Sequence, residues 1–243
     1  MALFRRRASE ADPVEARLAA FRAERVGAPE PPVSELLQAL EAPFQRKADL
    51  WLVEVGGAWA TFGWVARDAT LVGFLGYDEP PGPPTDLVRA NSETGLAWYD
   101  AGGDGLITRV TLPGEHVEPE GLALALAALR REAGGTEAPA TEWPEPDVDA
   151  ALAELPVALE EAAIAARGDT VELRIELETG CAPDEARAAW MLEMSGLRGA
   201  RLGIGAAGTL SAIAALPGRR VTPGGLGWAY GEVRALAGLY RRA

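Results

Sequence analysis

The chain has 243 residues, 48% of them hydrophobic, which suits one large domain or two small ones, each with a core of its own. Its net charge of −13 opposes direct binding to nucleic acids, because that affinity comes largely from Lys and Arg displacing counterions. One cysteine, Cys181, rules out an internal disulfide framework and favours a reducing compartment.

Nothing in the sequence predicts a membrane protein or a secreted one. No apolar run approaches the roughly 20 residues that span a bilayer, and Arg5–Arg7 are not followed by an apolar stretch of the kind found in a secretory signal. We therefore expect a cytoplasmic protein without membrane contact. The acidic surface favours basic partners, although it can also serve solubility alone.

The first half of the sequence, up to residue 134, predicts helices that alternate with a group of strands. Gly56-Gly57 and Arg67-Asp68 separate three strand-like segments, as hairpin turns would. The predicted elements are a helix over Val33–Leu40, strands over Leu50–Val55, Ala58–Val65 and Thr70–Tyr77, and a short helix near Asp86–Ala90.

The first half ends in a hairpin and a helix. Leu106–Leu112 alternates like a half-buried strand, and Leu96–Tyr99 is its expected partner across Asp100–Gly105. Pro113-Gly114 then turns the chain, and Pro119 opens a helix whose apolar stripe of Leu122, Leu126 and Leu129 is typical of a core contact.

A Gly-, Pro- and Thr-rich segment over residues 135–147 reads as a linker to a second half, residues 148–243. That half predicts a helix over Val148–Ala166 and one alternating strand over Thr170–Glu178. A helix opened by Ala182–Glu185, a hairpin and a last helix complete it. The second half thus has fewer predicted strands than the first.

An internal repeat relates the two halves. A shift of 104 positions places Leu112–Leu122 over Leu216–Leu226 with seven residues identical and no gap. The same shift pairs Leu106 with Leu210, and Arg130 with Arg234. Because the register holds on both sides of the turn, we interpret the repeat as a duplication of a hairpin-plus-helix unit. The predicted fold class is α+β, with two related halves, each an antiparallel sheet packed by helices.

Gly203–Gly208 has the literal spacing G-x-G-x-x-G that is found in dinucleotide sites. A nucleotide site needs a helix directly after the glycines, so that the phosphates meet its N-terminus. Here the repeat places these glycines in a hairpin turn before the strand-like Leu210–Leu216. We therefore interpret them as turn glycines, and expect no cofactor.

The other candidates for chemistry are isolated. Cys181 precedes a predicted helix, but the sole histidine, His116, belongs to the other half, where we expect it on the surface of a turn. One His and one Cys cannot make a zinc cage. The sequence therefore predicts no catalytic residue and no metal site.

Aromatic residues crowd one predicted hairpin. Phe62 and Trp64 share one face of their strand and Trp59 lies on the other, with Trp51 on the neighbouring strand. A sheet that helices cover on one side cannot bury both sets, so one set is either exposed or covered by a partner or by the other half. We therefore predict Trp59, Phe62 and Trp64 as protein-binding residues.

The order of elements in the first half resembles the YbjN-like family and the type III secretion chaperones. The likeness rests on a strand, Leu-Pro-Gly, a short spacer, Thr/Glu-Pro and a long helix, at Leu106–Arg131 and again at Leu210–Arg242. The helix that includes residues 184–192 is similar to the family's middle helix. On this resemblance, residues 1–134 form a YbjN-like domain with N-terminal helices, and residues 148–243 a shortened second one.

The resemblance implies no active site and no cofactor, but dimerisation and the holding of partly unfolded protein segments against sheet edges and apolar patches. We therefore expect a non-catalytic, chaperone-like or adaptor protein, a homodimer, that binds a client protein with a preference for basic segments. The alternatives are a small-molecule or nucleotide-binding enzyme that uses Gly203–Gly208, and a structural subunit of a larger assembly.

Overall fold

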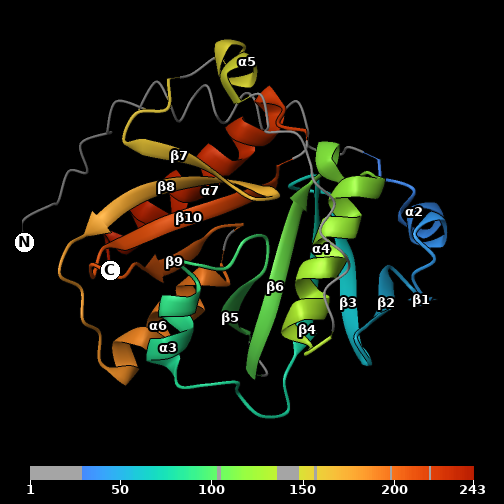
Figure 1. Cartoon of the computed structure of the whole chain (residues 1–243), viewed down its shortest axis with the longest axis horizontal. Coiled ribbons are helices and arrows are strands. Elements are labelled where there is room, and N and C mark those ends of the chain that lie inside the picture. The colour runs from blue at the N-terminus through green and yellow to red at the C-terminus, as the bar shows by residue number, and fades with distance from the viewer. Residues whose placement is uncertain (1–28, 103–104, 136–147, 156–157, 198, 219) are drawn as a thin grey trace, which may run out of the picture.

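The computed structural model describes residues 29–102, 105–135, 148–155, 158–197, 199–218 and 220–243. These residues form two antiparallel sheets, one of six strands and one of four, each packed by helices (Figure 1). The expected α+β class and the smaller second half are therefore confirmed. The expected linker over 135–147, apart from Gly135, and the expected N-terminal helices before residue 29 lie outside the described residues.

The first half contains the six-stranded sheet, in the order β1-β2-β3-β4-β6-β5. All helices and strands that the sequence predicts over residues 29–134 are present, and β1 is an addition that its short, polar sequence did not signal. The elements are α2 (Val33–Ala39), β1 (Phe44–Lys47), β2 (Leu50–Val55), β3 (Ala58–Val65), β4 (Thr70–Gly76), α3 (Pro84–Ala90), β5 (Trp98–Gly102), β6 (Gly105–Pro113), the 3-10 turn η1 (Gly114–His116) and α4 (Pro119–Glu132).

The second half contains the four-stranded sheet, in the order β7-β8-β10-β9. The prediction of one helix over Val148–Ala166 is wrong: the helix α5 ends at Ala153, and Ala162–Arg167 forms strand β7. Pairing with β8 overrides the helix propensity of this alanine-rich segment. The elements are α5 (Val148–Ala153), β7 (Ala162–Arg167), β8 (Thr170–Glu178), α6 (Glu185–Ser195), β9 (Arg201–Ile204), β10 (Leu210–Pro217) and α7 (Pro223–Tyr240).

The two halves repeat the same pairing of strands. In each, the last strand pairs antiparallel with the strand before the middle helix, so that Thr70 faces Pro113 in one and Thr170 faces Pro217 in the other. The turn after that strand is closed in the same way, by Gly114 N–H donating to Ala69 at 2.7 Å and Gly218 N–H donating to Asp169 at 2.6 Å. The related halves predicted from the sequence are thus related in backbone geometry.

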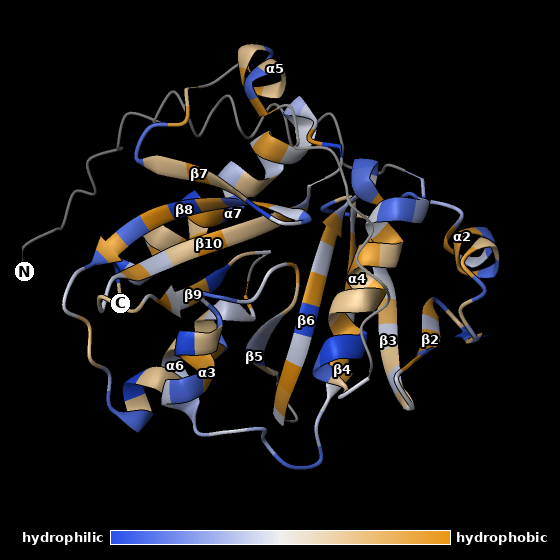
Figure 2. Ribbon diagram, in the orientation of Figure 1, coloured by the Kyte–Doolittle hydropathy of each residue, from blue (hydrophilic) through white to orange (hydrophobic). Residues whose placement is uncertain are grey.

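One long helix covers one face of each sheet. In Figure 1, α4 lies in front of the six-stranded sheet and α7 behind the four-stranded sheet. Alternation along the strands decides which side chains meet the helix, and the alternating colours along β6 in Figure 2 follow this rule. The inward side chains of the six-stranded sheet include Trp51, Phe62, Leu71 and Leu112, which form one core with Leu122, Leu126 and Leu129 of α4.

The middle helices α3 and α6 join the two halves. They contact each other, and each also contacts the inner strand of the opposite half: α6 packs against β5, and α3 against β9. Leu87 and Val88 of α3 accordingly belong to the core of the second half. Each half therefore completes its packing with a helix from the other.

His116 is a second point of contact between the halves. It is 1% exposed, so the expectation of a surface turn residue is wrong. Its ring lies against the first turn of α7, where Thr222 caps the helix by accepting the Gly225 N–H at 3.0 Å. Gly225 leaves the room that the ring occupies, which explains a glycine at this position.

Gly225→Ala should destabilise the protein by about 1–3 kcal/mol, because the added methyl group would overlap the buried His116 ring. The matched control is Gly238→Ala in the same helix, where the nearest atom to a new methyl is a terminal nitrogen of Arg242 at 3.6 Å. That change should stabilise by about 0.5–1 kcal/mol through helix propensity. Urea unfolding measures both, and two effects of the same sign would contradict the packing described.

Candidate functional site

The face of the six-stranded sheet opposite α4 is partly open. Among the described residues, α6 and the segment after it cover this face on the side of β5, and Leu197 and Trp228 approach it at Val65 and Val72. Over β2, β3 and β4 the face carries apolar side chains with no cover: the exposed fractions are 43% for Leu50, 48% for Trp59, 39% for Val65 and 38% for Phe74. We call these four residues the open face.

The structure separates the three aromatic residues that the sequence predicted as binding residues. Trp59 lies on the open face, whereas Phe62 is 1% exposed and belongs to the core. Trp64 is half-buried on the core side, where its ring contacts Gly114. The predicted division of the strand into two sets is correct, but Phe62 is not available to a partner.

Glycines allow large side chains to lie flat on both faces of this sheet. Leu50 lies over Gly63 on the open face, and Phe62 lies over Gly73 on the core face. A bulky neighbour that covers a strand glycine shields backbone that would otherwise be exposed. Sequence reasoning missed Leu50, Val65 and Phe74 because their exposure depends on the pairing register, which places them on the same face as Trp59.

A hollow of about 170 Å³ marks the end of the open face, where the second half begins. Val65 and Val72 form one wall, and Leu197 and Trp228 from the second half form the other. Its polar groups are those of Arg109, Thr111 and Glu232, among others. The hollow combines apolar walls with charged groups, which is the usual composition of a site that binds a side chain or a small ligand.

Charges on and around the open face include more acidic than basic side chains. Glu54 lies opposite Trp59, and Asp68 and Glu232 line the hollow, whereas Lys47 of β1 lies opposite Leu50. Arg109 also lines the hollow, but its Nε lies 2.5 Å from the buried carboxylate of Asp100. Burial raises the pKa of Asp100 to about 6, against the opposite effect of Arg109. This face therefore has the charge that suits a basic partner.

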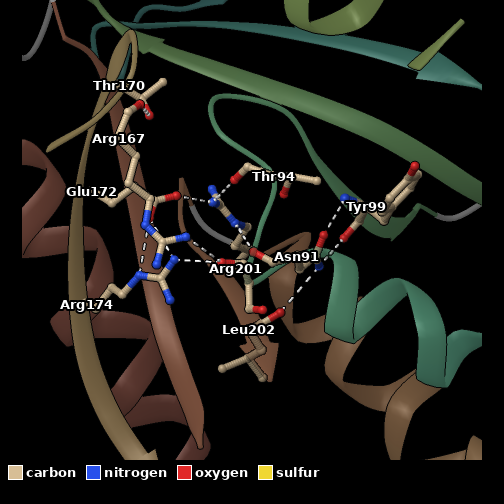
Figure 3. A network of polar contacts seen from close by, with 10 residues as sticks. Asn91, Thr94, Tyr99, Arg167, Thr170, Glu172, Arg174, Arg201 and Leu202 are labelled. Atoms are coloured by element: carbon tan, nitrogen blue, oxygen red, sulfur yellow. Dashed lines mark hydrogen bonds and ion pairs between the residues drawn. The ribbon is translucent and has the colours of Figure 1, made fainter. Parts of the chain in front are cut away.

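A second charged cluster lies between the halves, with Arg201 and Glu172 fully buried at its centre (Figure 3). Arg201 of β9 is 0% exposed; it donates to Glu172 Oε1 at 2.8 Å, to the Asn91 carbonyl at 2.6 Å and to the Thr94 carbonyl. Arg174 approaches the same carboxylate at 2.7 Å. Burial lowers the pKa of Arg201 to about 10, so the guanidinium keeps its charge at neutral pH.

The side-chain amide of Asn91 adds hydrogen bonds to this cluster. It donates to the Tyr99 carbonyl at 2.9 Å and to Leu202 of the second half at 3.3 Å, and accepts the Tyr99 N–H at 2.7 Å. The cluster holds the turn after α3 against β8 and β9, with its charges opposed by their neighbours. Arg201 Nη1 is buried without a hydrogen-bond partner among the described residues, while the other groups of the cluster bond to one another. We therefore assign the cluster a structural role.

The glycine motif is a hairpin turn. Gly205–Gly208 connects β9 to β10, with Gly208 at φ 73°, and strand β10 follows directly where a nucleotide site would need a helix. A glycine is required at position 203 for a different reason, because any side chain there would overlap the backbone of Asn91 and Ser92. The motif therefore permits a turn and a close approach of the two halves.

The remaining candidates are far from a catalytic arrangement. Cys181 is 5% exposed, and burial raises the pKa of its thiol, which disfavours a reactive thiolate. Within the described residues no group of three or more His, Cys, Asp or Glu side chains could hold a metal ion. None of the helices in the described part of the chain combines the length and the apolar character that a bilayer crossing requires.

Comparison of the chain with protein-family models, with curated proteins and with solved structures returned no match.

Arg201→Met should lower the free energy of unfolding by about 3–5 kcal/mol, because it leaves a buried carboxylate short of a partner and two carbonyls without donors. The control is Arg241→Met, which removes an exposed pair with Glu161 at 3.3 Å and should cost at most about 1 kcal/mol. Guanidinium unfolding of both variants makes the comparison, and similar losses would refute the role given to Arg201.

Asp100 should give a distinct pH dependence of stability. Its pKa of about 6 in the folded protein exceeds its ordinary value of 3.8, so the folded state binds more protons between these values. The stability contributed by this group is therefore greatest at low pH and falls as pH rises through 6. The unfolding free energy of the wild type relative to Asp100→Asn should rise when pH falls from 7 to 5, by an amount on the order of 1–3 kcal/mol.

Glu178 provides the control of opposite sign. Hydrogen bonds from Tyr240 and Arg187 lower the pKa of this exposed carboxyl. Its contribution should therefore be lost as pH falls, and the wild type relative to Glu178→Gln should lose stability on acidification. A pH-independent difference between wild type and Asp100→Asn would contradict the raised pKa.

Proposed function

We propose that the chain is a non-catalytic, chaperone-like or adaptor protein that holds a segment of a client protein on the open face. The observation that carries this proposal is that four exposed apolar side chains lie on one face of β2, β3 and β4, on the side opposite α4. Apolar groups gathered on one surface are typical of protein interaction sites. The resemblance to type III secretion chaperones, noted from the sequence, implies the same kind of activity.

The charges of the protein support a basic client. The net charge is −13, and Glu54, Asp68 and Glu232 lie at or beside the open face. Complementary charge speeds encounter and selects among partners, while apolar contacts supply most of the affinity. A suitable client would be an extended segment in which apolar and basic side chains alternate. Its apolar side chains would lie against Trp59 and Phe74, and its basic side chains would lie near Glu54, Asp68 and Glu232.

The proposal extends to location and assembly. A single cysteine suits the reducing cytoplasm, and we propose a homodimer there. The enzyme alternative, which used the glycines of the β9–β10 turn, has no geometric observation in its favour, because no helix follows them.

Binding of unfolded proteins of opposite charge tests the proposed function. The probes are lysozyme and α-lactalbumin, each unfolded by reduction and carboxamidomethylation, which gives a basic and an acidic chain. The wild type should bind unfolded lysozyme more tightly, and Trp59→Ser combined with Phe74→Ser should weaken that binding by roughly tenfold or more. Fluorescence anisotropy of labelled probes measures the affinities.

Trp190→Ser is the matched control, since Trp190 is a half-buried tryptophan of the second half that packs against the Tyr240 ring at a tilted angle. It should leave binding unchanged. Thermal unfolding establishes that each variant is folded before binding is compared. A folded double variant that binds unfolded lysozyme as the wild type does would overturn the proposal.

A further inference from the structure

The hollow at the end of the open face lies between the two halves of the chain. Its floor is the six-stranded sheet, where Val72 of β4 lies opposite Thr111 of β6 and on the same face as Val65 of β3. Leu197 and Trp228 of the second half face this floor. The volume is about 170 Å³, whereas the pocket of a drug-sized ligand has roughly 300–1,000 Å³. The hollow therefore suits a single side chain or a ligand of that size.

The floor of the hollow carries a hydroxyl group whose hydrogen-bonding capacity is unused. Thr111 is 4% exposed and lines the hollow, and its Oγ1 has no hydrogen-bond partner among the described residues. Thr70, which also lines the hollow, differs in donating its hydroxyl to the Asp68 carbonyl at 2.9 Å. A buried hydroxyl without a partner is unfavourable. The Thr111 hydroxyl is therefore placed to accept a hydrogen bond from an occupant of the hollow.

The charges around the hollow favour a positively charged occupant. Asp68 and Glu232 line it, and the Glu232 carboxylate is held in place by accepting the Gly199 N–H at 2.9 Å. Arg109 is the one cation among the described lining residues, and it lies against the buried carboxylate of Asp100, which offsets its charge. Three carboxylates beside one guanidinium leave an excess of negative charge, which attracts a cation.

An organic cation fits this hollow better than a metal ion does. Within the described residues no group of three or more His, Cys, Asp or Glu side chains could hold a metal. The walls of Val65, Val72, Leu197 and Trp228 offer no oxygen ligands, but they suit the methylene groups of an alkyl chain. An ammonium group has three donors and a guanidinium five, so the ammonium needs fewer acceptors than a guanidinium at a floor with one unused hydroxyl.

We propose that the hollow binds a primary ammonium group at the end of an alkyl chain of about four carbons, the length of a lysine side chain. The alkyl chain lies between Val72 and Trp228, and the ammonium donates to Thr111 Oγ1, with Asp68 and Glu232 supplying the opposing charge. Of the lining residues only Val65 belongs to the open face. The site therefore stands independently of the proposed function.

Butylamine is the probe, and butanol and butyrate are its neutral and anionic counterparts. At constant ionic strength butylamine should bind with a Kd on the order of 1–10 mM, as expected of a ligand with so few atoms. Butanol and butyrate should bind at least roughly tenfold more weakly, because neither brings a positive charge. Nitrogen–proton NMR follows the titration through the indole N–H signal of Trp228, which is assigned by its absence from the spectrum of Trp228→Phe.

Thr111→Val and Glu232→Gln test the two polar contacts, since each keeps the shape of the side chain and removes an acceptor or a charge. Each should weaken butylamine binding by roughly fivefold or more. The matched controls are Thr61→Val and Glu54→Gln, which make the same changes on the same face of the sheet but outside the hollow. Both controls should keep the wild-type affinity. Thermal unfolding verifies that every variant is folded.

Blocked pentapeptides identify the source of the ammonium group. One has a lysine flanked by alanines, and the other has norleucine in its place. A shift of the Trp228 signal with the lysine peptide alone assigns the site to a lysine of another protein. A shift with butylamine but with neither peptide assigns it to a free amine.

Three results would refute the ammonium site. They are no shift of the Trp228 signal up to roughly 100 mM butylamine, binding of butanol or butyrate as tight as that of butylamine, and wild-type affinity in either Thr111→Val or Glu232→Gln. The double variant of Trp59→Ser and Phe74→Ser should bind butylamine as the wild type does. Loss of client binding and loss of amine binding are therefore distinguishable.

Discussion

A buried guanidinium must find an acceptor or an opposing charge for its N–H groups, and the Nε and Nη2 groups of Arg201 find them on both halves of the chain at once. Glu172 comes from the second half, whereas the carbonyls of Asn91 and Thr94 come from the first. Removing any of them leaves polar groups stranded in a medium that solvates them poorly. The mutual placement of the two sheets therefore depends on this cluster as well as on the apolar contacts of α3 and α6.

The open face follows from that placement. In each half the long helix, α4 or α7, covers one side of the sheet. The middle helices α3 and α6 form the contact between the halves. No described element is left to cover the outer surface of β2, β3 and β4. The small sheet has no counterparts of β1 and β2, and its side opposite α7 meets the turn after α3, where Glu172 is buried. The asymmetry in strand number thus accompanies an asymmetry in exposure: one sheet presents apolar side chains, and the other is closed by the interface.

Much of this fold could be predicted from the sequence because the duplicated unit has strong local signals. Strands β6 and β10 and helices α4 and α7 lie 104 positions apart, as the aligned prolines indicated. β7 could not be recognised, since its alanines favour a helix until β8 lies beside them. His116 and Arg201 could not be placed either, because their burial is created by residues about 110 positions away. The alternation of residues along β3 predicted two sets of aromatic side chains on opposite sides of the sheet. Which of these two sides would be uncovered depended on helix packing.

Because α3 packs against the second half, it cannot complete its packing until that half has been synthesised. Leu87 and Val88 belong to a core built mainly from residues of the second half, which a ribosome makes later. At a usual rate of about 5–20 residues per second, the interval lasts several seconds. During this interval the nascent chain exposes the apolar side chains of α3 and the carbonyl groups of Asn91 and Thr94, which are buried in the folded protein. A protein proposed to shelter unfolded segments thus passes through a vulnerable stage of its own.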